Sequence, residues 1–484
     1  PLQKLQFRPG LNREGTDYSN EGGWYDGDKI RFRSGFPEKI GGWTQVSPNQ
    51  FLGTARSLWV WSDADAGAGS IYTGVGTSDK YYIYTGGVYY DITPIIYTST
   101  LSGTSPYPLT TIAPTTLNGT ITATDTSITL TSASSFPSVG TIRIDSEDIY
   151  YTGKSSNTLT GCVRGYNGTT AAAHTTGADV YSFSILVGDG TYNPSAGDYV
   201  YISSSYTVGG ATVTGDYKVD TVPSSTTYYI SPSVGNTTAT WATSSATRSA
   251  STVIEYEYPV GSNVFTIGTG WGAGPWGRST WGSGYALGVG QQLRLWSNDN
   301  YGSNLVIAPR GGPIFYWQDS LGTSTRAQYL SDLANAETLI TTAATFGSSA
   351  TSITVSSADA PYIYPYMYIT GTNLPTGTQV ASTHITGSTT VNITTTSTGS
   401  SSGNYAFSYA GDFVPNSTYQ VITSAIQDFV IAFGANPYSP NSAGTTFNGM
   451  LVRWSDQANP YQWIPTVTNQ SGEYTLTNGS YIMG

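Results

Sequence analysis

Carboxylate side chains are the groups in this sequence best suited to acid–base chemistry. Glu255 and Glu257 alternate in the segment VIEYEYP, and Asp145, Glu147 and Asp148 cluster in RIDSEDIYY. A glycosidase requires such a pair of carboxyl groups. Neighbouring acids on an exposed strand more often form a solvated face or protect a sheet edge from aggregation, and we favour that interpretation over catalysis.

Histidine and cysteine chemistry has few residues to draw on. His174 and His384 are the only histidines, and Cys162 is the only cysteine. We therefore expect no Ser-His-Asp triad, no zinc site and no disulfide within the chain. The stretch that begins at Asp63 is similar to a calcium loop, but its twelfth position is Gly74, where an EF-hand needs an acid. The expectation is a protein without enzymatic activity or cofactor.

Tryptophans recur every five residues in GTGWGAGPWGRSTWGSG, at Trp271, Trp276 and Trp281. Aromatic rings at that spacing could form a platform on which a sugar stacks. The favoured alternative is that they pack on the body of the protein while glycine lets the backbone pass close by.

Three segments of the sequence share one pattern of strands and turns, and we expect them to form the framework of the protein. They are Arg56–Pro94, residues 293–319 and residues 428–466, and each combines alternating apolar strands with an Asn/Asp/Gly turn and a closing aromatic strand. Self-similarity around large insertions predicts blades of one β-propeller. An acid just after a strand Trp can accept a hydrogen bond from its own turn, and Arg310 and Arg453 can pair with such acids. The expected repeat residues are Trp61, Asp63, Trp296, Asp299, Arg310, Trp317, Arg453, Trp454, Asp456 and Trp463.

The composition predicts an all-β chain, since 57 glycines and 38 tyrosines accompany only 10% charged residues. One short helix is expected within residues 326–339. The predicted architecture is an interrupted β-propeller-like core with inserted small β-barrel or sandwich domains. Its expected parts are a basic N-terminal hairpin segment (1–50), blades at 51–109, 259–336 and 413–484, and inserted domains at 110–183, 184–258 and 337–412. The last set of blades is expected to be incomplete at the C-terminus.

The charge is unevenly distributed along a chain whose net charge is -11. An acidic molecule should repel a polyanion such as DNA. The N-terminal segment is basic, and Lys29, Arg31, Arg33 and Lys39 could contact an acidic partner. The alternative is that these charges pair with one another along a hairpin. No apolar run is long enough for a membrane span, and the N-terminus lacks a signal-peptide core.

Several segments resemble a family of structural proteins encoded by tailed bacteriophages. They are NEGGWYDGDKIRFRSGFPEKIGGW, the Trp/Gly segment 268–284, residues 293–319, MLVRWSDQANPYQW and GEYTLTNGSYIMG. Ser127–Thr170 resembles exchangeable modules of phage tail proteins, whereas residues 337–412 lie outside the resemblance.

The resemblance extends more remotely to the propeller-bearing tail nozzles of short-tailed phages. It implies a virion protein made in the host cytoplasm, a homo-oligomeric ring of about six copies, contacts with a tail adaptor and with fibres or spikes, and genomic DNA passing through without specific binding. The alternative is a carbohydrate-binding or carbohydrate-cleaving tail fibre, spike or surface adhesin, using Trp271, Trp276 and Trp281 or the tyrosine-rich inserted strands.

Overall fold

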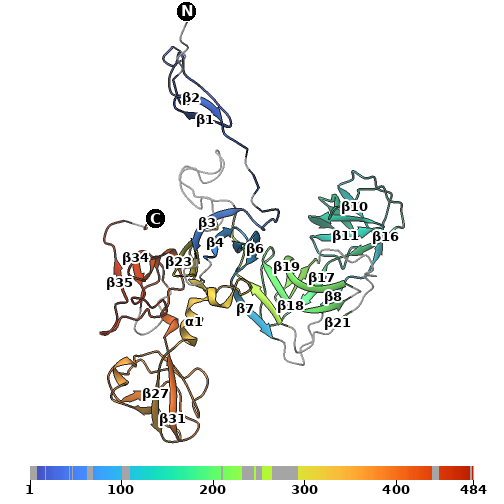
Figure 1. The fold of residues 1–484 in the computed structure, drawn as a ribbon. Helices are drawn as coiled ribbons and strands as arrows, with labels where there is room; N and C mark the ends of the chain where they lie inside the picture. The colour runs from blue at the N-terminus through green and yellow to red at the C-terminus, as the bar shows by residue number, and fades with distance from the viewer. Residues whose placement is uncertain are drawn as a thin grey trace, which may run out of the picture. The chain divides into compact units, whose positions relative to one another are not determined.

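The computed structural model describes residues 8–16, 18–42, 44–45, 47–62, 69–100, 109–208, 211–231, 245–246, 253–263, 293–438, 446–479 and 482. Antiparallel β-sheets make up almost all of its regular structure (Figure 1). The α-helix of the described residues is α1 (Leu330–Ala336), and three short 3-10 helices are η1 (Asp319–Leu321), η2 (Ala360–Tyr362) and η3 (Gly411–Phe413). The all-β class is confirmed, and α1 falls inside the segment predicted to be helical.

The chain forms two compact units, Pro1–Gln50 and Phe51–Gly484. The first unit contains the hairpin of β1 (Ile30–Arg33) and β2 (Phe36–Lys39), joined by a turn at Ser34 and Gly35. Both turn residues have positive φ, which matches the twist of a hairpin. The predicted alternation is present in β1, where Ile30 and Phe32 are half-buried and Arg31 and Arg33 are exposed.

Three four-stranded antiparallel sheets, which we call the first, second and third frame sheets, arise from the three repeated segments. In each sheet the strands follow one another in chain order. The first contains β3 (Ala55–Ser62), β4 (Ile71–Thr77), β5 (Tyr81–Thr85) and β6 (Val88–Asp91). The second contains β23 (Trp296–Tyr301), β24 (Asn304–Pro309), β25 (Phe315–Trp317) and β26 (Gln328–Tyr329). The third contains β32 (Thr418–Thr423), β33 (Val430–Ala435), β34 (Asn448–Trp454) and β35 (Gly472–Thr475).

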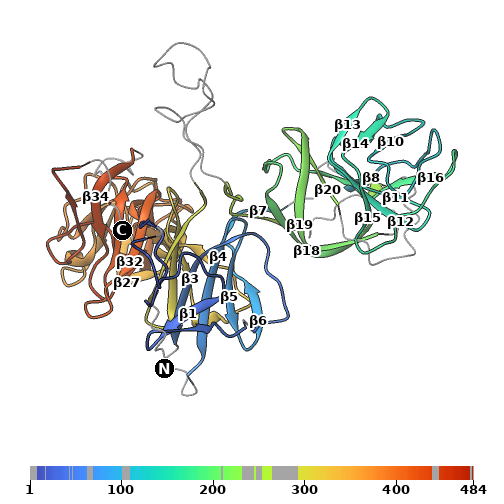
Figure 2. The ribbon, with the colours of Figure 1, turned by 90° about the horizontal axis from the view of Figure 1, so that it is seen from above.

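The second frame sheet packs between the other two (Figure 2). Side chains alternate between its faces, so Leu305 and Ile307 of β24 join a core with the first sheet, whereas Val306 and Ala308 join a core with the third. The first strands are neighbours, because β23 contacts both β3 and β32. This double burial explains why NLVIAP in β24 reads as a continuous apolar run.

An eight-stranded sheet follows the first frame sheet and corresponds to the second predicted insertion. It includes β7 (Ile95–Thr100), which lies in the predicted first blade, and β8 (Leu109–Thr111), which crosses the predicted boundary between that blade and the first insertion. Its long strand β19 pairs with β18 through its first half and with β20 through its second. The remaining bounds are β17 (Ile185–Gly188), β18 (Tyr199–Val208), β19 (Ala211–Ser224), β20 (Thr227–Ile230), β21 (Ser245–Ala246) and β22 (Val253–Glu257).

The first inserted domain is nested inside that sheet, because β8 and β17, which flank it in sequence, pair with each other. Its own ends also meet, since β9 pairs with β16. One core of aliphatic side chains fills the space around its two sheets. Their strands are β9 (Thr115–Thr116), β10 (Ser127–Thr129), β11 (Gly140–Ile144), β12 (Glu147–Tyr151), β13 (Gly153–Ser155), β14 (Thr158–Thr160), β15 (Val163–Tyr166) and β16 (Asp179–Ser182).

The third inserted domain is a five-stranded sheet with its own core, which also includes Phe413 and Ile464 from the region of the third frame sheet. Ser/Thr-rich strands of this kind bury one apolar face and leave a hydroxylated face in water. Its strands are β27 (Thr338–Phe346), β28 (Ser352–Val355), β29 (Tyr368–Thr370), β30 (Thr390–Asn392) and β31 (Ser401–Ser408).

Candidate functional site

The tryptophans of the repeat are structural anchors that occupy different places in their sheets. Trp61 donates its indole hydrogen to Ser303 O at 2.9 Å, and Trp296 donates to Thr77 O at 2.7 Å, so the first two frame sheets hold each other reciprocally. Trp317 is fully buried between them, with its ring 6.3 Å from that of Trp61. Three of the expected repeat residues therefore meet at this contact.

The tryptophans of the third segment do not occupy the same strand positions as those of the other two segments. Trp454 lies on β34, the third strand of its sheet, whereas Trp61 and Trp296 lie on first strands. Its indole donates to Gln470 O at 2.7 Å within its own sheet region. Trp463 lies outside the strands and is buried in the core between the second and third sheets. The Trp-Ser-Asp sequence that the first and third segments share therefore lies on strands that are not equivalent.

The predicted acids accept backbone hydrogen bonds, but in two different settings. Asp456 follows β34 and accepts from the amides of Gln457 and Gln470 at 2.9 and 2.7 Å, as a turn acid should. Asp299 lies inside β23 and accepts from Thr423 N of the third sheet at 2.8 Å, so it joins two sheets. Asp63 lies outside the described residues.

Neither arginine pairs with the acid expected for it. Arg453 is buried, donates to the carbonyls of Phe413 and Asn436 at 2.7 and 3.1 Å, and lies 3.9 Å from Glu473. Its partner is Glu473 because register places that acid opposite it on β35. Burial lowers the pKa of Arg453 to about 10. Arg310 instead lies over the Tyr419 ring, at 4.3 Å from its centroid.

Two of the four N-terminal basic residues, Lys29 and Arg31, make local pairs of the kind that was the alternative to a partner contact. Arg31 forms an ion pair with Glu38 across the hairpin, and Lys29 lies 3.4 Å from Asp28. Lys39 lies opposite Ile30, and Arg33 lies opposite Phe36 next to the turn. All four basic side chains are exposed, so these pairs add little stability. The predicted Trp271, Trp276 and Trp281 lie outside the described residues.

The outer faces of the first and third frame sheets carry apolar side chains that the described residues leave uncovered. On the first sheet Leu58, Val60 and Ile71 are 68%, 62% and 64% exposed. Register places all three on the face opposite Trp59 and Trp61. Monomeric soluble proteins rarely expose contiguous apolar patches unless another surface binds there.

The third sheet has a matching outer face. Its cross-strand neighbours there include Phe433, Val452 and Tyr474, and Tyr474 is 59% exposed. The opposite face of the same strands carries Val421 and Ala432, which are buried against the second sheet. We call the two uncovered surfaces the outer faces of the frame.

A charge cluster with Lys80 and Glu257 buried at its centre joins the first frame sheet to the eight-stranded sheet. Lys80 Nζ lies 2.6 Å from Asp91 Oδ2, 3.0 Å from Glu257 Oε1 and 3.2 Å from Asp216 Oδ2. Arg326 lies against the same three acids, at 2.6, 3.0 and 3.3 Å from Asp91, Glu257 and Asp216. The five residues come from four separate parts of the chain, so no local sequence pattern could have predicted their meeting.

The charge cluster contains three carboxylates and two cations. Burial, reinforced by Asp91, raises the pKa of Glu257 to about 8 against the opposing effect of Lys80 and Arg326. Burial also acts on Asp91, but Lys80 and Arg326 outweigh it and lower the pKa of that acid. The pKa values of these two neighbouring carboxyl groups are therefore shifted in opposite directions.

The same acids have the spacing of metal ligands, since one oxygen from each lies within 4.8 Å of the others. Lys80 and Arg326 already supply two positive charges at that centre. A further cation would be repelled by both of them. The residues present therefore do not fit a metal ion, and the cluster is a structural junction.

A cleft of about 810 Å³ opens beside this charge cluster. One wall is a row across the eight-stranded sheet, in which Tyr201 of β18 pairs with Glu255 of β22, and Glu255 pairs with Thr98 of β7. The other wall is the segment from Ser324 into α1. Glu255 was weighed in the sequence as a solvated strand acid, but it is half-buried, and burial raises its pKa against the opposing effect of Arg326.

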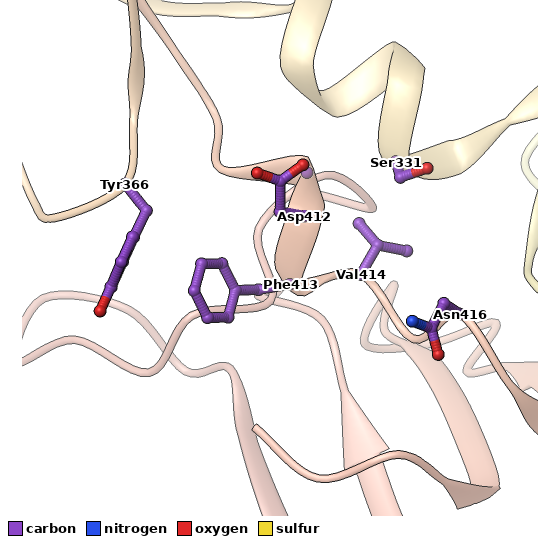
Figure 3. Close-up of a pocket in the computed structure, with 7 residues that line it drawn as sticks. Ser331, Tyr366, Asp412, Phe413, Val414 and Asn416 are labelled. Atoms are coloured by element: carbon purple, nitrogen blue, oxygen red, sulfur yellow. The ribbon is translucent and has the colours of Figure 1, made fainter. Parts of the chain in front are cut away.

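A smaller pocket of about 430 Å³ lies where α1, η3 and the third inserted domain meet (Figure 3). Asp412 is its acidic residue, and it accepts hydrogen bonds from Gln379 Nε2 at 3.1 Å and Tyr368 Oη at 3.2 Å. Tyr366 and Phe413 form an aromatic side of the pocket. Because the acid is already engaged by protein donors, this pocket offers less to a ligand than the cleft does.

Two of the three acids of RIDSEDIYY, Glu147 and Asp148, are buried, whereas Asp145 is exposed as expected of a solvated strand acid. Glu147 is fully buried and accepts from Arg164 Nε, from the amides of Gly165 and Ala172, and from His174 Nε2 at 2.8 Å. Burial opposes ionisation, but these donors, led by Arg164, lower the pKa of Glu147 to about 2. Asp148 is also buried and pairs with Arg143 at 2.7 Å. These acids stabilise the first inserted domain, which corrects the exposed-strand interpretation.

No family model, curated protein or solved structure matches this chain. Among the residues that the structure describes, no helix is long and apolar enough to cross a membrane.

Proposed function

We propose that this chain is a virion structural protein, the tail nozzle or tail tube of a tailed bacteriophage. In this role copies of the chain form a ring whose channel retains genomic DNA and then conducts it. The ring lies below a tail adaptor and carries fibres or spikes. The resemblance of the repeated segments to phage tail proteins motivates this proposal.

The observation that carries the proposal is the stacking of the three frame sheets with outer faces that remain apolar. Four-stranded antiparallel sheets with neighbouring first strands are the units of a β-propeller, and we infer that the frame is propeller-like. Three sheets do not close a ring, and each end of the stack needs a further apolar surface.

We infer that neighbouring copies supply that surface. The outer face of the first sheet in one copy packs on the outer face of the third sheet in the next, as β24 already packs between two sheets within one copy. Such a head-to-tail contact generates a ring when the rotation closes. The resemblance sets the expected number at about six copies.

The charge of the molecule suits a conduit for DNA. A net charge of -11 with few basic residues disfavours binding to phosphates, so a duplex would pass without being held. The charge cluster contributes no free cation, because Lys80 and Arg326 are both engaged by acids. A structural role also needs no catalytic group, and we propose none.

The mass of the purified chain in solution tests this function. Native mass spectrometry should show a ring of about six copies, and electron microscopy should show its central channel. A trimer would instead support the fibre or spike alternative, and a monomer at micromolar concentration would contradict both. Labelled antibody on phage particles should bind at the distal tail.

A further inference from the structure

The cleft beside the charge cluster has walls suited to a ligand rich in hydroxyl groups. Tyr201 and Tyr329 place aromatic rings in it, and Glu255, Gln328 and Asp332 place hydrogen-bonding groups there. Its volume of about 810 Å³ lies within the range of ligand sites, which runs from about 300 to 1,000 Å³. Aromatic faces next to acceptors and amides are the groups that bind the C–H and O–H surfaces of a sugar.

The aromatic rings are fixed before any ligand arrives. Tyr329 packs on Phe315 with ring centroids 4.7 Å apart, and Arg326 holds the Tyr201 ring at 5.7 Å from its centroid. Tyr201 and Glu255 are direct cross-strand partners, so the ring and the carboxylate lie side by side on one face of the sheet. A pre-organised wall lowers the entropic cost of binding.

The charge of the cleft selects against anions. Arg326 is its basic residue among the described lining residues, and it is committed to Asp91, Asp216 and Glu257. Glu255 and Asp332 add further carboxylates, while Gln328 adds an amide. An acidic polysaccharide or a phosphate group would meet repulsion, whereas a neutral sugar can donate its hydroxyls to these acids.

From this geometry we propose that the cleft binds a neutral oligosaccharide, with Tyr201 and Tyr329 contacting sugar rings and Glu255 and Gln328 hydrogen-bonding their hydroxyls. The inference does not depend on the ring. A monomeric chain would keep the same cleft, because both walls belong to one copy.

Binding can be measured with a panel of neutral oligosaccharides of two to four glucose, galactose or mannose units. Saturation-transfer NMR would identify binders among them, and calorimetry would measure affinity. We expect at least one to bind, and Tyr201→Ala and Glu255→Ala each to weaken it at least about tenfold. Tyr362→Ala, at an exposed tyrosine of the third inserted domain, is the matched control and should leave affinity unchanged.

Circular dichroism and the melting transition of each variant would first establish that it is folded. Failure of every neutral oligosaccharide to bind the wild-type chain would overturn the proposal. So would binding that survives both cleft substitutions, or a preference for acidic oligosaccharides or peptides over neutral sugars. None of these three results would bear on the mass of the assembly, so the tests of the cleft and of the ring are independent.

Discussion

The second frame sheet and its two neighbours are built from similar residues but differ in how many of their faces are covered. In β24 of the second sheet, side chains on both faces are buried. In β3 one face is packed and the other exposes Leu58 and Val60, and in β34 the outward side chains are only half-buried. Apolar groups on both faces of a sheet are stable in water only when both faces are covered. The comparison teaches that, among the described residues, the first and third frame sheets lack on their outer faces the cover that the second sheet has on both faces.

The largest effect on stability should come from a substitution in the core between the first and second frame sheets. Trp317→Ala removes a fully buried ring between the first and second frame sheets, and we expect it to cost about 3–5 kcal/mol in the free energy of unfolding. Hydrogen exchange in β24 and β25 would measure this locally. Trp454→Ala, which removes a half-buried ring on the outer face of the third sheet, is the matched variant. Equal losses at both positions would break the distinction between covered and outer faces.

A somewhat smaller loss is expected at Arg453. Arg453→Ala leaves the carbonyls of Phe413 and Asn436 buried without their donor, which should cost about 3 kcal/mol. Chemical denaturation followed by tryptophan fluorescence would report it, since Trp463 lies beside the guanidinium. Arg310→Ala is the control, because the Arg310 side chain is exposed and stacks on the Tyr419 ring. A loss at Arg310 as large as that at Arg453 would contradict this account.

The charge cluster predicts a pH dependence of stability. Because the folded-state pKa of Glu257 is raised to about 8, its protonated form contributes stability below the ordinary pKa of 4.5 that is lost as pH rises through 8. Glu257→Gln removes this titration and should flatten the decline between pH 5 and 8. Melting temperatures across that range would measure it. A steeper decline in the variant than in the wild type would show that the sign is wrong.

The smallest effect on folding is expected on the outer faces. Val60→Asp places a charge on an exposed strand position, so the free energy of unfolding should change by less than about 1 kcal/mol. The same charge would be buried in a contact between copies and should abolish the ring. Analytical ultracentrifugation would detect the loss. Thr73→Asp, at a half-buried position of the same face opposite Val60, should act in the same direction but more weakly.

The repeated strands were predictable because their pattern is local. Alternation and turn residues placed the three frame sheets, and the repeat tryptophans Trp61 and Trp296 lie at the contact between two of them. The pairing of Arg453 was not predictable, because Glu473 meets it only through the register of β34 and β35. Local sequence similarity also gave the wrong strand for Trp454. Its Trp-Ser-Asp sequence begins on the third strand of its sheet, whereas that of Trp61 begins on a first strand.

The buried acids show where sequence reasoning fails for a physical reason. Glu147 and Asp148 look like a solvated pair because adjacent acids repel, yet Arg164, His174 and Arg143 meet them from distant parts of the first inserted domain. Glu257 is contacted by Lys80 and Arg326, which are far from it in sequence. The nesting of one inserted domain in another likewise depends on the pairing of β8 with β17.

Cross-linking between the two outer faces tests the central claim most directly. One variant would carry Val60→Cys and a second Tyr474→Cys, on a chain whose own Cys162 is buried. A short bismaleimide should link the two variants when they are mixed and leave each one unlinked on its own, because the proposed contact is head-to-tail. A link within Val60→Cys alone, or no link in the mixture, would contradict the account.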